Sequence, residues 1–97
     1  MSYFKKTQWN FLGLQVSDRK DKMYNGILQN IQTGKIKKIP FGSSSYENFS
    51  DNTGLNAYPQ LIHGDTNRQR LYKLRHQKDI KKGYWSAGLF SMIYLWS

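Results

Sequence analysis

The stretch "MYNGILQNIQTGKIKKIPFG", residues 23–42, carries the strongest structural pattern in this sequence. Two runs of residues that favour β-structure flank Thr33-Gly34, and this arrangement predicts a β-hairpin at about residues 23–41. A two-residue loop at that pair would set three cross-strand pairs: Ile31 with Ile36, Leu28 with Ile39, and Gly26 with Phe41. In the last pair the phenylalanine ring would cover the gap that a glycine leaves in a strand. A type I turn with a bulge at Gly34 would instead shift the register by one residue.

The C-terminal segment "SAGLFSMIYLW", residues 86–96, predicts a helix. Ser86 is a good N-cap, and Leu89, Ile93 and Trp96 follow one another on a single helical stripe. Apolar residues also occupy most of the remaining circumference, which is typical of a buried helix. We therefore expect these three side chains to pack on the hairpin. The alternative is that the segment is an interaction surface for a partner.

Residues 65–80 predict a second, basic helix. Asp65 suits the N-cap, because its carboxylate can accept hydrogen bonds from the first turn and complements the helix dipole. Lys81 and Lys82 suit the C-terminal end, and Gly83 suits the position after it. The apolar face of this helix is thin, with Leu71 and Leu74 joined by Tyr72 and Ile80.

The N-terminal residues 3–16 predict a strand. Its alternation would place Trp9 and Phe11 on one face, and Leu12, Leu14 and Val16 on the other. Together these segments predict an α+β fold in one small domain, residues 1–97, with residues 1–16 as an N-terminal strand or arm. Its β-hairpin or three-stranded antiparallel sheet would pack with the basic helix and the apolar C-terminal helix.

Charge is the dominant feature of the composition. Fifteen Lys and Arg residues against six Asp and Glu residues give a formal net charge of +9, and there is no cysteine. Such a balance favours polyanions such as DNA or RNA, acidic protein surfaces or anionic lipid as partners. The absence of cysteine excludes disulfides and thiolate metal sites.

Targeting and membrane signals are weak. Polar residues interrupt the N-terminal apolar stretch, so it lacks the core of a signal peptide. The apolar tail from Tyr84 to Trp96 is shorter than the roughly 18 residues of a membrane span. We therefore expect a protein of the cell interior that is not secreted and does not span a membrane.

Catalytic patterns are equally weak. His63 and His76 are the only histidines, and Asp65 lies two positions after His63. A histidine–aspartate pair can serve as a general base, but a loop histidine beside a helix cap explains the same residues. No phosphate-binding glycine loop occurs. We expect no enzyme, no cofactor and no metal site.

The basic helix is the predicted binding surface for nucleic acid or another polyanion. Its cations are Arg68, Arg70, Lys73, Arg75, Lys78, Lys81 and Lys82. Helical spacing places Arg68, Arg75 and Lys82 on one side, and Arg70, Lys73 and Lys81 on another. Aromatic residues beside these cations give the predicted partner contacts, Tyr72, Tyr84 and Trp85.

The order of four motifs resembles that in a family of short proteins of unknown function from nucleocytoplasmic large DNA viruses. The motifs are "SDRKDKMY", "KKIPFGSSSYENFSD", "HGDTNRQRLYKLRHQKD" and "WSAGLFSMIYLW", and they cover residues 17–96. The matching positions are Phe41, Gly42, Tyr46, Arg68, Tyr72, Arg75, His76, Ser86, Ala87, Gly88, Leu95 and Trp96. Residues 53–62 read as an insertion, and residues 1–16 have no counterpart. The family brings no known activity, but the resemblance implies a viral source.

Two functions follow as hypotheses. The first is a structural or assembly component of the virion, of the minor capsid or cement type, that binds other virion proteins or acidic surfaces. The alternative is a nucleic-acid-binding protein that uses residues 65–82 without sequence preference. Both place the protein in the virion or in the cytoplasm or nucleus of the host, and both allow a homo-oligomer. An interfacial membrane protein ranks last, because the tail lacks a polar face.

Overall fold

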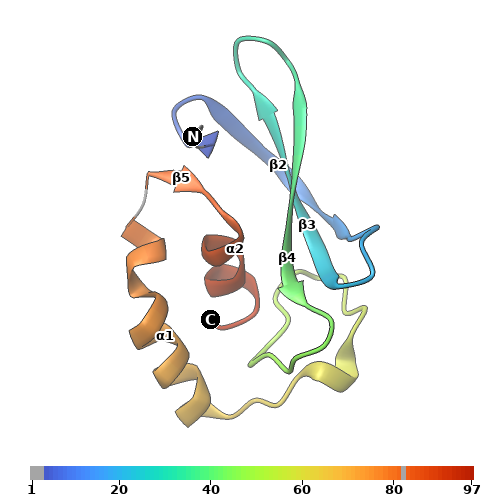
Figure 1. Ribbon diagram of the computed structural model, residues 1–97, viewed down its shortest axis with the longest axis vertical. Coiled ribbons are helices and arrows are strands. Elements are labelled where there is room, and N and C mark those ends of the chain that lie inside the picture. The colour runs from blue at the N-terminus through green and yellow to red at the C-terminus, as the bar shows by residue number, and fades with distance from the viewer. Residues whose placement is uncertain (1–3, 82) are drawn as a thin grey trace.

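The structure, a computed structural model, describes residues 4–81 and 83–97, and it confirms the small α+β domain (Figure 1). In chain order the elements are β1 (Phe4–Lys5), β2 (Trp9–Val16), β3 (Lys22–Asn30), β4 (Ile36–Ser43), the 3-10 turn η1 (Pro59–Leu61), α1 (Thr66–Lys81), β5 (Tyr84–Trp85) and α2 (Ala87–Tyr94). Strands β2, β3 and β4 form an antiparallel sheet in that order, while β1 pairs with β5. Helix α2 lies between α1 and the larger sheet.

The β3–β4 hairpin is confirmed, but its predicted register is wrong. The loop has four residues, 31–34, because the N–H of Asn30 donates to the carbonyl of Lys35 at 2.8 Å. The side-chain oxygen of Asn30 accepts from the N–H groups of Gln32 and Thr33, and Gly34 takes the left-handed conformation with φ 73°. An asparagine that satisfies two loop amides thus favours the longer loop over both predicted turns.

The longer loop moves every cross-strand pair by two residues. Tyr24 now faces Phe41, Gly26 faces Ile39, and Leu28 faces Lys37. Because side chains alternate with a period of two, this shift keeps each residue on its predicted face while changing its partner. The Ile31–Ile36 pair is absent, and both residues are about half exposed near the loop.

Phe90, and not Phe41, covers Gly26. A Cβ atom at Gly26 would lie 2.5 Å from Cζ of Phe90, so the ring rests directly on the strand backbone. Phe90 is fully buried, and its ring also stacks on Phe41 at 5.3 Å and on Trp85 at 5.5 Å between centroids. This close approach holds α2 against the sheet.

Strand β2 contains a bulge that changes its predicted faces. The register shifts between Phe11 and Gly13, which leaves Leu12 as the extra residue, 54% exposed. Gly13 has φ 147°, a conformation that disfavours a side chain. Beyond the bulge, Leu14 joins Trp9 and Phe11 on the core side. The prediction that Leu12 and Leu14 share a face is therefore wrong.

Both predicted helix caps are confirmed. The carboxylate of Asp65 accepts from the N–H of Asn67 at 2.9 Å and of Arg68 at 3.2 Å. The hydroxyl of Ser86 accepts from the N–H of Leu89 at 3.1 Å. These bonds satisfy amides that have no partner within the first helical turn.

The predicted apolar face of α1 is wrong at Leu71 and Leu74 and correct at Tyr72. Leu71 and Leu74 are 45% and 56% exposed, and the Ile80 side chain lies outside the described residues. Tyr72 packs inward as predicted, and Gln69 joins it in place of the two leucines. The Gln69 amide donates to the carbonyl of Trp96 at 3.2 Å, and the Tyr72 ring stacks on Trp96 at 4.1 Å with an interplanar angle of 4°.

The tail is part of the core, although not through all the residues predicted. Leu89 and Trp96 are buried, whereas Ile93 is 39% exposed. Trp96 stacks on α1, and Phe90 makes the close contact with the hairpin. Strand β5, which the sequence did not predict, pairs with β1. Along the described part of the chain, no helix has both the length and the apolar character needed to cross a bilayer.

We predict that Phe90→Ala lowers the free energy of unfolding by about 3–5 kcal/mol, because it removes a fully buried ring. The control on the same helix is Ile93→Ala, which should cost about 1 kcal/mol because Ile93 is partly exposed. Urea denaturation followed by circular dichroism measures both. Phe90→Leu keeps the comparison measurable if the alanine variant does not fold. Equal losses at positions 90 and 93 would contradict the structure.

Candidate functional site: a cationic cleft

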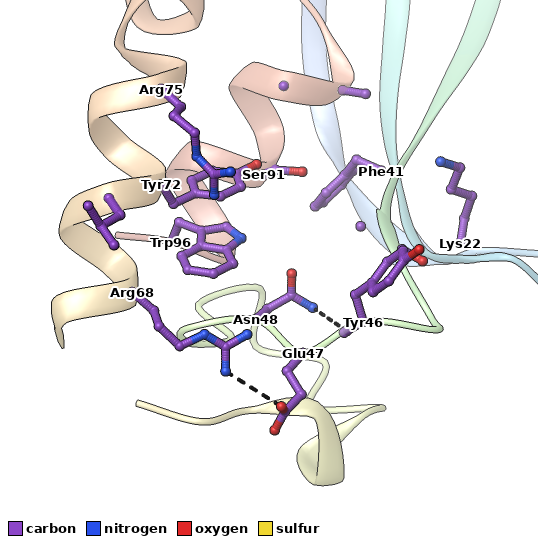
Figure 2. Close-up of a pocket in the computed structure, with 15 residues that line it drawn as sticks. Lys22, Phe41, Tyr46, Glu47, Asn48, Arg68, Tyr72, Arg75, Ser91 and Trp96 are labelled. Carbon is purple, nitrogen blue, oxygen red and sulfur yellow. Dashed lines mark hydrogen bonds and ion pairs between the residues drawn. The ribbon is translucent and has the colours of Figure 1, made fainter. Parts of the chain in front are cut away.

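A cleft of about 480 Å³ opens between α1, the end of β4 with the loop after it, and the start of α2 (Figure 2). Helix α1 contributes one wall, and β3, β4 and residues 46–48 contribute the opposite wall. Trp96 forms part of the floor between them. The cleft thus exists only because residues from distant parts of the sequence meet.

The cleft is cationic. Arg68 and Arg75 line it from α1, and Lys22 lines it from β3. Glu47 is the one acidic residue among the described lining, and it pairs with Arg68 at 3.5 Å between nitrogen and oxygen. Within the described chain, Arg75 and Lys22 have no acidic partner. Two cations from opposite sides of the cleft, Arg75 on α1 and Lys22 on β3, therefore remain available to an anion.

The large aromatic side chains beside the cleft stack on one another. Tyr72 lies between Trp96, at 4.1 Å, and His76, at 4.2 Å. Two stacked rings at these distances, with interplanar angles of 4° for Trp96 and 26° for His76, cover both faces of Tyr72. The ring of His63 lies 5.4 Å from that of Trp96. This stack forms a rigid wall, and it leaves no open face of Tyr72 for a partner.

The other two predicted partner contacts lie away from the cleft. Trp85 stacks on Phe90, and its indole N–H donates to the carbonyl of Trp9 at 3.2 Å. Tyr84 is half-buried in β5. The ammonium group of Lys6 lies 4.9 Å from the centre of the Trp85 ring. These residues help to join the two ends of the described chain.

Tyr46 differs from the other aromatic residues. Its side chain is 73% exposed at the cleft, and among the described residues it stacks on no other ring. Its backbone is held in place, because its N–H donates to the carbonyl of Ser43 and its own carbonyl accepts from the Asn48 side chain, both at 3.4 Å (Figure 2). Tyr46 thus presents an exposed aromatic ring from a loop whose backbone is held by hydrogen bonds.

The loop that carries Tyr46 and Glu47 is fixed at its far end by Asn48. The Asn48 N–H donates to the carbonyl of Leu61 at 2.7 Å, and its carbonyl accepts from the N–H of His63 at 3.0 Å. Residues 53–62, which read as an insertion, therefore support the cleft. Tyr24 adds a second anchor, since its hydroxyl donates to Asp51 and accepts from the N–H of Ala57.

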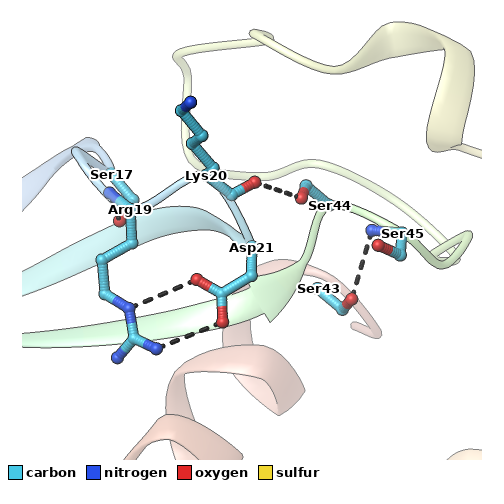
Figure 3. Close-up of polar contacts among 7 residues, drawn as sticks. All are labelled: Ser17, Arg19, Lys20, Asp21, Ser43, Ser44 and Ser45. Atoms are coloured by element: carbon cyan, nitrogen blue, oxygen red, sulfur yellow. Dashed lines mark hydrogen bonds and ion pairs between the residues drawn. The ribbon is translucent and has the colours of Figure 1, made fainter.

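The near end of the loop is tied to the turn at residues 17–21 (Figure 3). The hydroxyl of Ser44 donates to the carbonyl of Lys20 at 2.7 Å, and its N–H donates to the carbonyl of Asp21. Arg19 pairs with Asp21 at 3.1 Å. These bonds keep the turn before Lys22 beside the end of β4, and so set the sheet-side wall.

The remaining predicted cations divide into separate groups. Arg70 and Lys73 line another hollow on the opposite flank of α1, with Leu74 and Met92. Lys78 is exposed, and helical spacing places it on the flank of Arg75. The side chains of Lys81 and Lys82 lie outside the described residues. The helix therefore presents two basic flanks, of which one faces the cleft.

The His63–Asp65 pair does not have the geometry of a general base. Nδ1 of His63 accepts from the backbone N–H of Asp65 at 2.8 Å, while the Asp65 carboxylate caps α1. Across residues 4–81 and 83–97, no three histidine, aspartate or glutamate side chains gather as metal ligands.

Sequence reasoning missed Lys22 as a site residue and noted Tyr46 only through the family resemblance. Lys22 reads as one cation in a polar turn, and only the folded chain brings it opposite Arg75. An aromatic residue in a Ser-rich loop was the one available signal for Tyr46.

Comparisons of this chain with protein-family models, curated proteins and solved structures gave no match. The viral source that the motif resemblance implies therefore stays a prediction.

The anchor at Tyr24 predicts a pH dependence. Burial, and then the hydrogen bond to Asp51, raise the pKa of Tyr24 above its ordinary value near 10. The unfolded chain then ionises first, so this contribution to stability is present below about pH 10 and is lost as pH rises through the folded pKa. We expect urea midpoints of the wild type to fall more steeply from pH 9 to 12 than those of Tyr24→Phe. Parallel declines would contradict this anchor.

Proposed function

We propose that this chain is a binding protein without catalytic activity, which holds nucleic acid by its phosphate groups and without regard to base sequence. The observation that carries the proposal is the meeting of Arg75 and Lys22, neither of which has an acidic partner within the described chain, on facing walls of one cleft. A net charge of +9 would attract any polyanion to this surface.

The polar lining supports nucleic acid over an acidic protein. Contacts to phosphate and sugar come mainly from Arg, Lys, Ser, Asn and Tyr side chains and from backbone N–H groups. The cleft exposes this set, with Ser43, Asn48 and Ser91 beside its cations. Centres of protein interfaces are instead depleted in charged residues. Here the large rings that such a centre would use are stacked within the fold.

A structural or assembly role in a virus particle is the second proposal. The exposed Leu71 and Leu74 on α1 favour it, because apolar side chains on a charged helix suit contact with another protein. The two roles are compatible, since a packaged genome would supply phosphate to the cleft.

We predict that Arg75→Ala weakens binding of a labelled oligonucleotide equally for all sequences. The slope of log affinity against log salt should fall in magnitude by about 0.7–0.9, the change for one lost phosphate contact. Arg70→Ala is the matched control, because it removes the same charge from the opposite flank of α1. Fluorescence anisotropy across a salt series measures both variants.

Glu47→Gln should act in the opposite direction. It removes the acidic partner of Arg68, so affinity should rise and the salt slope should steepen.

Equal effects of Arg75→Ala and Arg70→Ala would show that net charge, and not the cleft, governs binding. Absence of binding by the wild type at low salt would overturn the proposed function.

A further inference from the structure

We infer that the nucleic acid held by the cleft is a single strand, with one of its bases stacked on Tyr46. This inference rests on the proposed function and specifies its ligand.

The size of the cleft favours a single strand over a duplex. Arg75 and Lys22 line opposite walls of a space of about 480 Å³, within the range of pockets that enclose small ligands. A duplex carries its phosphates on the outside of a stiff double helix, which is too large to enter such a space. A flexible single strand can pass between the walls and bring its phosphates near both cations. The facing cations therefore suit one strand.

Tyr46 supplies the second half of such a site. Single-strand binders combine a basic groove with aromatic rings on which bases stack, and this stacking tolerates any base. Tyr46 lines the basic cleft, is 73% exposed and stacks on no other described ring. Hydrogen bonds on both sides of its backbone hold the loop in place, so little order would have to be gained on binding. Figure 2 shows its ring on the sheet side of the cleft, across from Arg68 and Arg75, with its hydroxyl end toward Lys22.

The other aromatic residues of the cleft do not offer this surface. Tyr72 is enclosed between Trp96 and His76. Trp96 is 7% exposed, and Phe41 is fully buried and stacks on Phe90. A base that enters the cleft can therefore stack on the exposed ring of Tyr46. The stacked rings of Tyr72, Trp96 and His76 form a wall of the cleft.

An abasic strand separates stacking from charge, because it has the same phosphates but no bases. Binding of labelled oligo(dT) and of an abasic strand of equal length is measured by fluorescence anisotropy at fixed salt. The wild type should bind oligo(dT) more tightly than the abasic strand, and both more tightly than a duplex of that length. Tyr46→Ala should weaken oligo(dT) binding by about 5- to 150-fold and leave abasic binding unchanged. Tyr46→Phe and Tyr46→Trp should keep the wild-type difference in affinity between oligo(dT) and the abasic strand.

Leu71→Ala is the matched control, because Leu71 is a half-exposed apolar residue of the same cleft. It should change the binding of both strands alike. Equal wild-type affinity for oligo(dT) and the abasic strand would overturn the stacking inference and leave polyanion binding intact. Failure to bind any strand at low salt would instead overturn the proposed function. Equally tight binding of polyglutamate, weakened equally by Tyr46→Ala, would show an acidic peptide to be the ligand and would also overturn the inference.

Discussion

The contact of the Phe90 ring with the backbone at Gly26 is the constraint on which the rest of the structure depends. A side chain larger than hydrogen at position 26 would have to displace the Phe90 ring, because the ring occupies the space where a Cβ atom would lie. This contact brings α2 onto the sheet and lets Phe41 and Trp85 stack on the same ring. A small domain has few large side chains to bury, so one such approach decides where its helices lie.

The cleft follows from that position of α2. Trp96 lies just after α2, and its ring stacks on Tyr72, which aligns α1. Because α1 is held through Tyr72 and Gln69, most of its other described side chains stay exposed, including Arg68 and Arg75. The narrow inner face of α1 thus has a consequence for binding. It leaves the helix free to present cations, and it places one cationic flank opposite Lys22 and Tyr46.

The chemistry of short segments predicted the helices and strands, but not how these elements pair and pack with one another. Asp65 and Ser86 marked the starts of two helices, because a cap needs only its own first turn. The predicted faces of the hairpin were correct. Its register, however, depends on Asn30, which caps the loop, and the alternation of apolar and polar residues does not reveal such a cap. The bulge at Leu12 was also hidden, since it becomes visible only through pairing with β3. The cleft was half predicted: its cations on α1 were named, but the sheet-side wall is set by tertiary contacts.

A double-mutant cycle between Gly26 and Phe90 tests the central contact most directly. Gly26→Ala in the wild type should lower the free energy of unfolding by about 1–3 kcal/mol, because the new methyl group must displace the ring. In a Phe90→Leu background the same change should cost far less, since leucine lacks the Cε2 and Cζ atoms that lie 2.6 and 2.5 Å from the added Cβ. Urea denaturation of the four proteins gives the coupling energy, which should exceed about 1 kcal/mol. An equal cost of Gly26→Ala in both backgrounds would contradict the account.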